Sequence, residues 1–279
     1  MIRTRSGRLI VIGGHEDKED ERVILRAVAN EARNGALVVV TAASDLPHEV
    51  WADYEPIFRD LGVEDVRQLH VDSREQALDE TVHGVLDGAT CVFFTGGDQL
   101  KLTSQLGDTP VFQKTRAIYE SGGCVAGTSA GASVVCETMM VSGGSSASPR
   151  VGDALRMAPG FGFVSGVIID QHFAERGRIG RLIGAVAQNP RILGIGVDEN
   201  TALICEHGVS CTVLGEGAVY FVDARDVTQS NVVDDSTDRT LSVFNIRLHL
   251  LNMGDEFDLQ TRVPACHSTE QAEAKAGIS

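Results

Sequence analysis

The sequence predicts an α/β fold built on a doubly wound, mainly parallel sheet flanked by helices. Short apolar runs alternate with amphipathic stretches through much of the chain, as expected for buried parallel strands joined by helices. Several of these runs end in glycines or polar side chains, at the strand ends where ligands bind in such sheets. The C-terminal part has shorter apolar runs with glycine turns, which predict additional antiparallel strands.

The first half of the chain supplies the regular alternation. Continuous apolar runs predict strands over 8–12, 36–41, 66–71, 91–95 and 124–128. Amphipathic stretches predict the helices that connect and follow them, over 23–32, 49–61, 74–87, 110–121 and 130–136. Strands and helices at this pitch favour a parallel sheet.

The second half is less regular. Apolar runs over 163–169 and 192–197 each lead into polar side chains. Shorter antiparallel strands are expected at 201–205, 209–214 and 218–222, with an edge strand over 240–250. A serine- and glycine-rich segment over 142–150 is expected to be a mobile loop at the rim of the site.

Length and composition predict a single soluble domain. The chain has 279 residues, of which 43% are hydrophobic and 23% charged, as in ordinary globular proteins. We find no internal repeat and no linker that would divide it, so we expect one α/β domain over 1–279. The polar residues from about 266 to 279 are expected to be disordered.

Charge and cysteine content exclude several classes of protein. The net charge of −15 argues against a nucleic-acid-binding protein, which would carry a basic patch. No apolar run is long enough to span a membrane, and no secretory signal opens the chain. The six cysteines form no C-x-x-C pair, so we expect free thiols rather than a disulfide framework, and a cytoplasmic protein.

The central motif is Gly127-x-Ser129-x-Gly131. It matches the nucleophile elbow, in which a serine sits on a sharp turn between a strand and a helix. The turn exposes the hydroxyl, and the helix N-terminus behind it favours developing negative charge. The Ala130 N–H is a natural oxyanion donor, and Gly97 offers a second N–H beside the elbow. The alternative is a turn of small residues packed closely against the sheet.

A reactive serine needs a base, and the base needs a group that orients it. Of the eight histidines, His172 is best placed, because it follows the end of an apolar strand. Either Glu199 or Asp198 could orient it. The order of an α/β-hydrolase would instead make His207 or His249 the base, although the chain lacks the HGGG-type oxyanion loop and His207 falls in a predicted hairpin turn.

Cofactor and metal sites are not expected. Gly13-Gly14 resembles a phosphate loop only superficially, because no G-x-G-x-x-G is present and the following residues are acidic. The segments 15–17 and 205–207 hold isolated metal-ligand types without partners at zinc-site spacing. Three arginines, in contrast, follow His172 closely and either bind a carboxylate or form a solvated helix face: Arg176, Arg178 and Arg181.

Five motifs in order carry a family resemblance that spans roughly residues 8 to 260, at 13–18, 94–99, 127–133, 170–181 and 196–202. The chain resembles the serine peptidase family that includes cyanophycinases and aspartyl dipeptidases. This implies one peptidase domain with a fold like that of class I glutamine amidotransferases. It also implies a triad of Ser129, His172 and Glu199, and a substrate site that includes Gln99, Asp170, Gln171, Arg178 and Arg181.

The resemblance further implies a function. Family enzymes cut the poly-aspartate backbone of cyanophycin, in which arginine is joined to each side-chain carboxyl, and release β-Asp-Arg dipeptides. A cytoplasmic homodimer that uses no cofactor is expected. Two alternatives stay open, which are an aspartyl dipeptidase or related small-peptide hydrolase, and an inactive binding protein of the same fold. The presence of all three triad residues argues against the latter.

Overall fold

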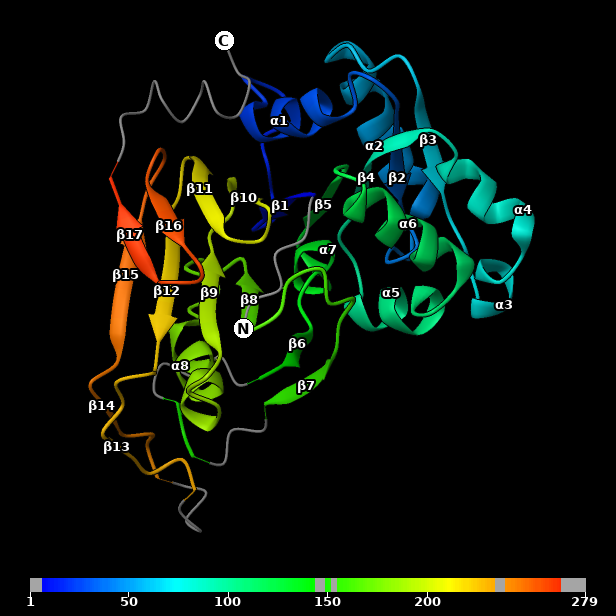
Figure 1. The fold of residues 1–279 in the computed structure, drawn as a ribbon. Helices are drawn as coiled ribbons and strands as arrows, with labels where there is room; N and C mark the ends of the chain where they lie inside the picture. Colours follow the sequence, from blue (N-terminus) through cyan, green and yellow to red (C-terminus); the bar gives the residue numbers. More distant parts are fainter. Residues whose placement is uncertain (1–6, 144–148, 152–154, 234–238, 267–279) are drawn as a thin grey trace.

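The structure, a computed structural model, describes residues 7–143, 149–151, 155–233 and 239–266 (Figure 1). Most of the predicted rim loop over 142–150 and nearly all of the predicted tail over 266–279 lie outside these residues.

A nine-stranded sheet forms the centre of the molecule, in the order β17-β16-β11-β10-β1-β5-β4-β2-β3. Its parallel half consists of β1 (Arg8–Ile12), β5 (Cys124–Thr128), β4 (Ala89–Phe94), β2 (Ala36–Val40) and β3 (Val66–Leu69). Antiparallel strands extend it from β1 onward: β10 (Thr201–Glu206), β11 (Ser210–Gly215), β16 (Glu256–Asp258) and β17 (Val263–Ala265). The prediction of a mainly parallel sheet with additional antiparallel strands is confirmed.

Helices cover both faces of this sheet, because successive side chains of a strand point to opposite faces. Ile10 and Ile12 of β1 pack with α1 (Val23–Glu31) and α2 (Pro47–Asp60). Leu9 and Val11 belong to the core on the other face, with α5 (Gln99–Leu106), α6 (Pro110–Glu120) and α7 (Ala130–Ser133). Both faces are therefore apolar, which explains the continuous apolar runs of the parallel strands.

A second sheet has four strands in the order β15-β12-β9-β8. These are β15 (Arg247–Leu251), β12 (Val219–Asp223), β9 (Leu193–Val197) and β8 (Val167–Gln171). Its inner face shares the core of α5–α7, and α8 (Ile179–Gln188) packs on its outer face. In Figure 1 it lies on the side of the molecule away from α3 and α4. The sequence did not distinguish this sheet from the first, because residues 198–200 carry the chain from β9 directly into β10.

Several elements differ from the prediction. The helix expected over 74–87 is divided into α3 (Arg74–Ala77), α4 (Glu80–His83) and the 3₁₀ turn η1 (Gly84–Leu86). Ser73 accepts a hydrogen bond from the Gln76 N–H, and Asp79 accepts one from the Thr81 N–H. Two N-terminal caps this close together start two short helices instead of one long helix.

The bounds of other elements also differ from the prediction. The helix after Ser129 ends at Ser133, three residues earlier than expected. The strand expected over 240–250 is divided between β15 and the short β14 (Val243–Phe244), which pairs with β13 (Gln229–Ser230). A further hairpin that we did not predict joins β6 (Thr138–Ser142) to β7 (Arg156–Pro159).

The expectation of free thiols is wrong for one pair of cysteines. Cys205 and Cys211 form a disulfide. Antiparallel pairing of β10 with β11 places the two residues directly opposite each other, which the sequence spacing alone did not reveal. Cys91, Cys124 and Cys136 are buried free thiols, and Cys266 is an exposed one.

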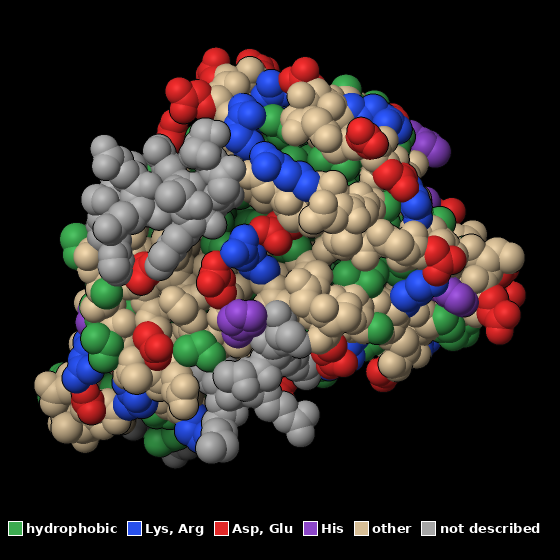
Figure 2. Space-filling view, turned by 45° about the horizontal axis from the view of Figure 1, so that its top comes forward, with side chains coloured by type: hydrophobic (Ala, Val, Ile, Leu, Met, Phe, Trp, Pro, Cys, Tyr) green, Lys and Arg blue, Asp and Glu red, His purple; other side chains and the backbone are tan. Residues whose placement is uncertain are grey.

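None of the helices in the described ranges is long and apolar enough to cross a bilayer. On the face shown in Figure 2, acidic and basic side chains lie intermixed rather than gathered by sign. The net charge of −15 is therefore not concentrated in one acidic patch on this face.

Candidate active site

Ser129 lies on the turn between β5 and α7, with φ 54° and ψ −111°. Two backbone approaches make this turn possible. A Cβ at Gly127 would lie 2.3 Å from the Gly131 carbonyl oxygen, and a Cβ at Gly131 would lie 2.2 Å from the Phe94 carbonyl oxygen. No side chain fits at either distance, so the glycine spacing of the motif follows from backbone packing around a strained serine.

Ser129, His172 and Glu199 form a continuous chain of contacts. Ser129 Oγ lies 2.9 Å from His172 Nε2, and His172 Nδ1 lies 2.6 Å from Glu199 Oε1. Ser129 follows β5 of the large sheet, whereas His172 and Glu199 follow β8 and β9 of the second sheet. The carboxyl ends of strands from both sheets therefore meet at one place, as the sequence predicted for strand ends.

His172 is buried, with only 3% of its surface exposed. Burial lowers the pKa of His172, the hydrogen bond that its ring donates to Glu199 opposes that shift, and the positive charge of Arg176 adds to the lowering. A lowered pKa keeps the imidazole neutral at neutral pH. Glu199 accepts from Nδ1, which leaves Nε2 free to accept the serine proton. This is the protonation state that a general base needs.

The two candidate orienting carboxylates have different partners. Glu199 contacts the imidazole. Asp198 instead accepts hydrogen bonds from the Ala174 N–H at 2.9 Å and the Ala218 N–H at 3.1 Å. Burial raises the pKa of Asp198, and these two hydrogen bonds oppose the shift. Asp198 therefore joins two loops around the site, and Glu199 is the carboxylate beside the histidine.

A buried network supports the elbow from the other side, and sequence reasoning missed it. Glu16 accepts from Tyr54 Oη at 2.5 Å and from Thr128 Oγ1 at 2.7 Å. Burial, followed by the charge of Glu16, raises the pKa of Tyr54 well above its usual value. Thr128 directly precedes Ser129, so the network fixes the entry to the turn. Its only sequence signal was that Glu16 follows the end of β1, at a strand end already singled out.

A cavity of about 650 Å³ opens beside Ser129 and His172. Arg176, predicted as a substrate contact, lines it. The negative charge in the cavity, opposite in sign to Arg176, comes from a stretch that we had not assigned to substrate. In this stretch Lys18 is flanked by acidic side chains: Glu16, Asp17, Glu19 and Asp20. The cavity thus presents both signs of charge, which suits a ligand that carries both a carboxylate and a cation.

The two expected oxyanion donors lie near the elbow. Ala130 is the first residue of α7, and Gly96 comes so close that a Cβ there would be 3.5 Å from Ser129 Cβ. Gly97 has φ +141°, and a Cβ there would lie 2.2 Å from the Ala43 carbonyl oxygen. Within the described ranges, neither the Gly97 nor the Ala130 N–H donates a hydrogen bond.

Arg178 and Arg181 are not free at the surface but are paired with a buried carboxylate. Asp170 is 2% exposed. Arg181 Nε lies 2.6 Å from Asp170 Oδ2, and Arg178 Nη1 lies 3.1 Å from Asp170 Oδ1. Arg178 also donates to the backbone oxygen of Gln171 and to its Oε1. Burial lowers the pKa of Arg178 to about 10.

Gln99 has a similar supporting position. Its Nε2 donates to the Met140 and Val141 carbonyl oxygens of β6, at 3.3 and 3.4 Å. Of the six residues predicted to bind substrate, the structure thus brings only Arg176 to the cavity that Ser129 lines. It gathers Asp170, Gln171, Arg178 and Arg181 into one buried cluster that does not line that cavity.

One group of described residues has the composition of a metal site. His15, His172 and Glu199 place one ligand atom each within 4.8 Å of one another. His15 Nδ1 lies 3.5 Å from Glu199 Oε2, and its ring meets that of His172 edge-on, with centroids 5.2 Å apart. The sequence predicted no metal site because His15 and Glu199 are far apart along the chain.

A serine on a strained turn, joined to a histidine that a carboxylate orients, is the arrangement found in serine hydrolases. The chain belongs to peptidase family S51, whose model matches residues 9–211. The predictions of this family and of a serine peptidase are confirmed.

Two relatives and one solved structure define the similarity further. The chain is 41% identical to the cyanophycinase of Trichormus variabilis over 264 residues. The matched region covers 93% of this chain and 88% of that protein. It is 39% identical over 258 residues to the cyanophycinase of Thermosynechococcus vestitus, with coverages of 91% and 80%. The crystal structure of a peptidase from an acI-B1 Actinobacterium superposes with a TM-score of 0.67 at 20% identity, over 92% of this chain and 98% of that one, and shares the fold.

Proposed function

We propose that this peptidase is a serine-type exopeptidase that hydrolyses the poly-aspartate backbone of cyanophycin to β-Asp-Arg dipeptides. The observation that carries the proposal is the chain of contacts from Ser129 through His172 to Glu199. It occurs in a protein whose curated relatives, matched over most of its length, are cyanophycinases.

The geometry supports an acyl-enzyme mechanism. Ser129 Oγ attacks the scissile carbonyl carbon while His172 Nε2 takes the serine proton. Glu199 stabilises the imidazolium that forms, and the N–H groups of Ala130 and Gly97 donate hydrogen bonds to the carbonyl oxygen as it becomes negative. His172 then gives its proton to the leaving amine, and a water molecule repeats the sequence on the acyl-enzyme to release the product and free Ser129.

The charge of the cavity suits the substrate. Each unit of cyanophycin carries a guanidinium and a free α-carboxylate on its arginine. Arg176 matches the carboxylate, and the acidic stretch that contains Asp17, Glu19 and Asp20 matches the guanidinium. We assign direct substrate contact to Arg176. The residues Gln99, Asp170, Gln171, Arg178 and Arg181 form the fixed wall behind it in this proposal.

Three further parts of the proposal come from the sequence, of which the homodimer is implied by the family resemblance. The enzyme is proposed to act as a single domain over 1–279, as a homodimer, and in the cytoplasm.

The test uses purified protein and insoluble cyanophycin, with soluble products followed by mass spectrometry. The wild type is expected to release β-Asp-Arg, and Ser129→Ala is expected to release none while remaining folded. Ser133→Ala, a buried serine of the same helix, is the matched control and should retain activity. Release by Ser129→Ala would overturn the mechanism. Cleavage of short α-Asp dipeptides without cleavage of the polymer would assign the protein to the aspartyl dipeptidases instead.

A further inference from the structure

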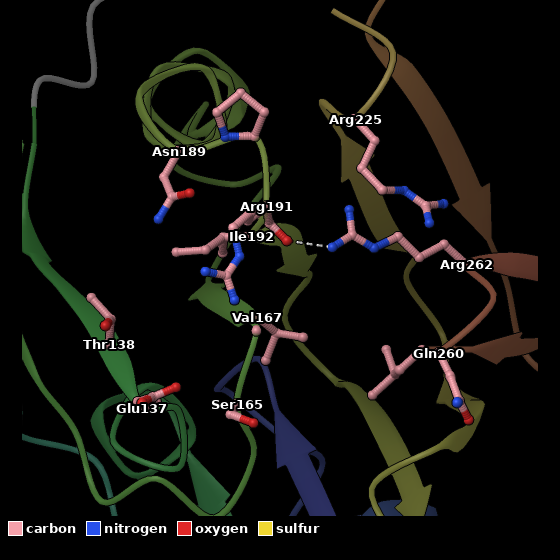
Figure 3. A pocket seen from close by; sticks show the side chains of 13 residues that line it. Glu137, Thr138, Ser165, Val167, Asn189, Arg191, Ile192, Arg225, Gln260 and Arg262 are labelled. Carbon is pink, nitrogen blue, oxygen red and sulfur yellow. Dashed lines mark hydrogen bonds between the residues drawn. The ribbon is translucent and has the colours of Figure 1, made fainter. Parts of the chain in front are cut away.

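A second cavity, of about 730 Å³ (Figure 3), is lined at the end of the four-stranded sheet opposite to the triad. Val167, the first residue of β8, and Ile192, which directly precedes β9, line it. His172 and Glu199 follow the other ends of the same two strands. Five strand residues at about 3.3 Å each separate the two places by roughly 17 Å along the strand direction. The second cavity is therefore distinct from the site around Ser129.

Three arginines from distant segments converge on this cavity: Arg191, Arg225 and Arg262. Asp223 accepts from Arg262 Nη1 at 2.6 Å and from Arg225 Nε at 2.9 Å. One buried carboxylate thus serves two guanidinium groups. Arg262 is in turn fixed by a hydrogen bond to the Arg191 carbonyl oxygen, seen as the dashed line in Figure 3. The arrangement leaves positive charge available to a further anion.

Arg191 is the arginine of this cavity whose positive charge is most open to an anion. Its side chain extends into the cavity (Figure 3). It is exposed, and among the described residues its guanidinium has no acceptor. The Arg225 side chain is 42% exposed. Both guanidinium groups line the same cavity and are open to a carboxylate, in a protein whose net charge is −15.

The facing wall has the opposite charge. Glu137 is exposed beside the hydroxyls of Thr138 and Ser165, and Figure 3 shows it across the cavity from Arg225 and Arg262. Within the described ranges its carboxylate has no ion-pair partner. A ligand with a carboxylate at one end and a cation at the other would satisfy both walls.

We propose that this cavity is a second binding site for the arginyl unit of cyanophycin. The free α-carboxylate of the arginine binds Arg191 and Arg225, and its guanidinium binds Glu137. This inference rests on the proposed function, because that function supplies the zwitterionic ligand. The unit comes either from the polymer, which the site would then anchor to the enzyme, or from the released β-Asp-Arg dipeptide.

The first arm of the test measures polymer binding. Ser129→Ala protein is pelleted with insoluble cyanophycin, and the bound fraction is compared with that of the same protein carrying Arg191→Glu or Glu137→Gln. Arg33→Glu, an exposed arginine in the turn after α1, gives the same change of charge as Arg191→Glu and is the control. We expect Arg191→Glu to weaken binding about tenfold and Arg33→Glu to leave it unchanged.

The second arm titrates β-Asp-Arg into the same proteins by calorimetry. Loss of dipeptide binding with Arg191→Glu would identify the released product as a ligand, whereas loss of pelleting alone would identify the polymer unit. If neither binding depends on Arg191, or if Arg33→Glu has the same effect, the second site is refuted. Cleavage of cyanophycin by the wild type is measured in parallel, so a failure of the proposed function would appear separately from a failure of this site.

Discussion

The backbone of Gly14 lies directly against the imidazole of His172. A Cβ at Gly14 would come within 2.3 Å of His172 Cε1 and 2.6 Å of Nε2. The same loop is bonded next to both His172 and Glu199, because Gly13 O accepts from the His172 N–H and Gly14 O accepts from the N–H of Asn200, which follows Glu199. The loop after β1 therefore fixes where the imidazole lies relative to Ser129.

Gly14→Ala should reduce activity through displacement of the ring. We expect kcat to fall about 100-fold, since a shift of about 1 Å in a catalytic group has that effect. Gly14 has φ +101°, so the alanine also adds backbone strain of about 1–2 kcal/mol. Steady-state kinetics on a soluble substrate and urea denaturation measure the two effects.

Gly62→Ala is the control that separates the effect of backbone strain from the effect of a contact with His172. Gly62 has φ +92°, and a Cβ there would meet nothing within 4 Å. The Gly62→Ala enzyme should lose about as much free energy of unfolding as Gly14→Ala does, but it should keep the kcat of the wild type. A Gly14→Ala enzyme with the kcat of the wild type would contradict the role assigned to this contact.

Glu199→Gln should cost less than His172→Ala, because an orienting group contributes less than the base itself. By analogy with other serine peptidases, we expect losses in kcat of about 10⁴-fold and about 10⁶-fold. Glu175→Gln is the control, since the Glu175 carboxylate accepts from the Glu199 N–H and does not contact the histidine. Equal losses for Glu199→Gln and His172→Ala would refute the assignment of roles.

The pH dependence should reflect the lowered pKa of His172. The imidazole must be neutral to accept the serine proton, so kcat/KM should rise with pH through the His172 pKa, below the usual value of about 6.5. Arg176 opposes the imidazolium, so Arg176→Gln should move the acid limb to higher pH. Glu199 stabilises it, so Glu199→Gln should move the limb to lower pH.

The control for this series is Arg33→Gln, which removes an exposed positive charge that does not line the cavity beside Ser129. Its profile should coincide with that of the wild type at low ionic strength, where charge effects are largest. An acid limb that moves to lower pH in Arg176→Gln would contradict the electrostatic explanation.

Asp170→Ala should destabilise the protein strongly. It leaves the Arg178 and Arg181 guanidinium groups buried without their carboxylate, and breaking such a group typically costs about 3–5 kcal/mol. Asp226→Ala breaks an exposed pair with Arg247 and should cost less than about 1 kcal/mol. Urea denaturation compares the two. If both variants had the free energy of unfolding of the wild type, the buried cluster would not stabilise the fold.

Local patterns were sufficient to single out Ser129, His172 and Glu199, which the structure brings into contact. The glycines at 127 and 131 flank Ser129 in one short motif, which a local pattern detects although the Gly131 backbone also lies against Phe94 of another strand. His172 and Glu199 each follow an apolar strand, and strand ends of parallel sheets converge. Contacts between segments were harder to predict. Glu16 joins Tyr54 to Thr128 across three separate segments, and nothing near Glu16 in the sequence indicates either partner.

The sequence by itself determined the alternation of strands and helices, the elbow and the polar strand ends, because these depend on side-chain periodicity and on turn sterics between near neighbours. Only the tertiary structure decided which way the charged side chains face. Arg178 and Arg181 are three residues apart, so a helical arrangement places them together in either case. They face Asp170 rather than water because α8 packs on the second sheet, beside the end of β8. That orientation depends on how distant segments pack, which no local pattern specifies.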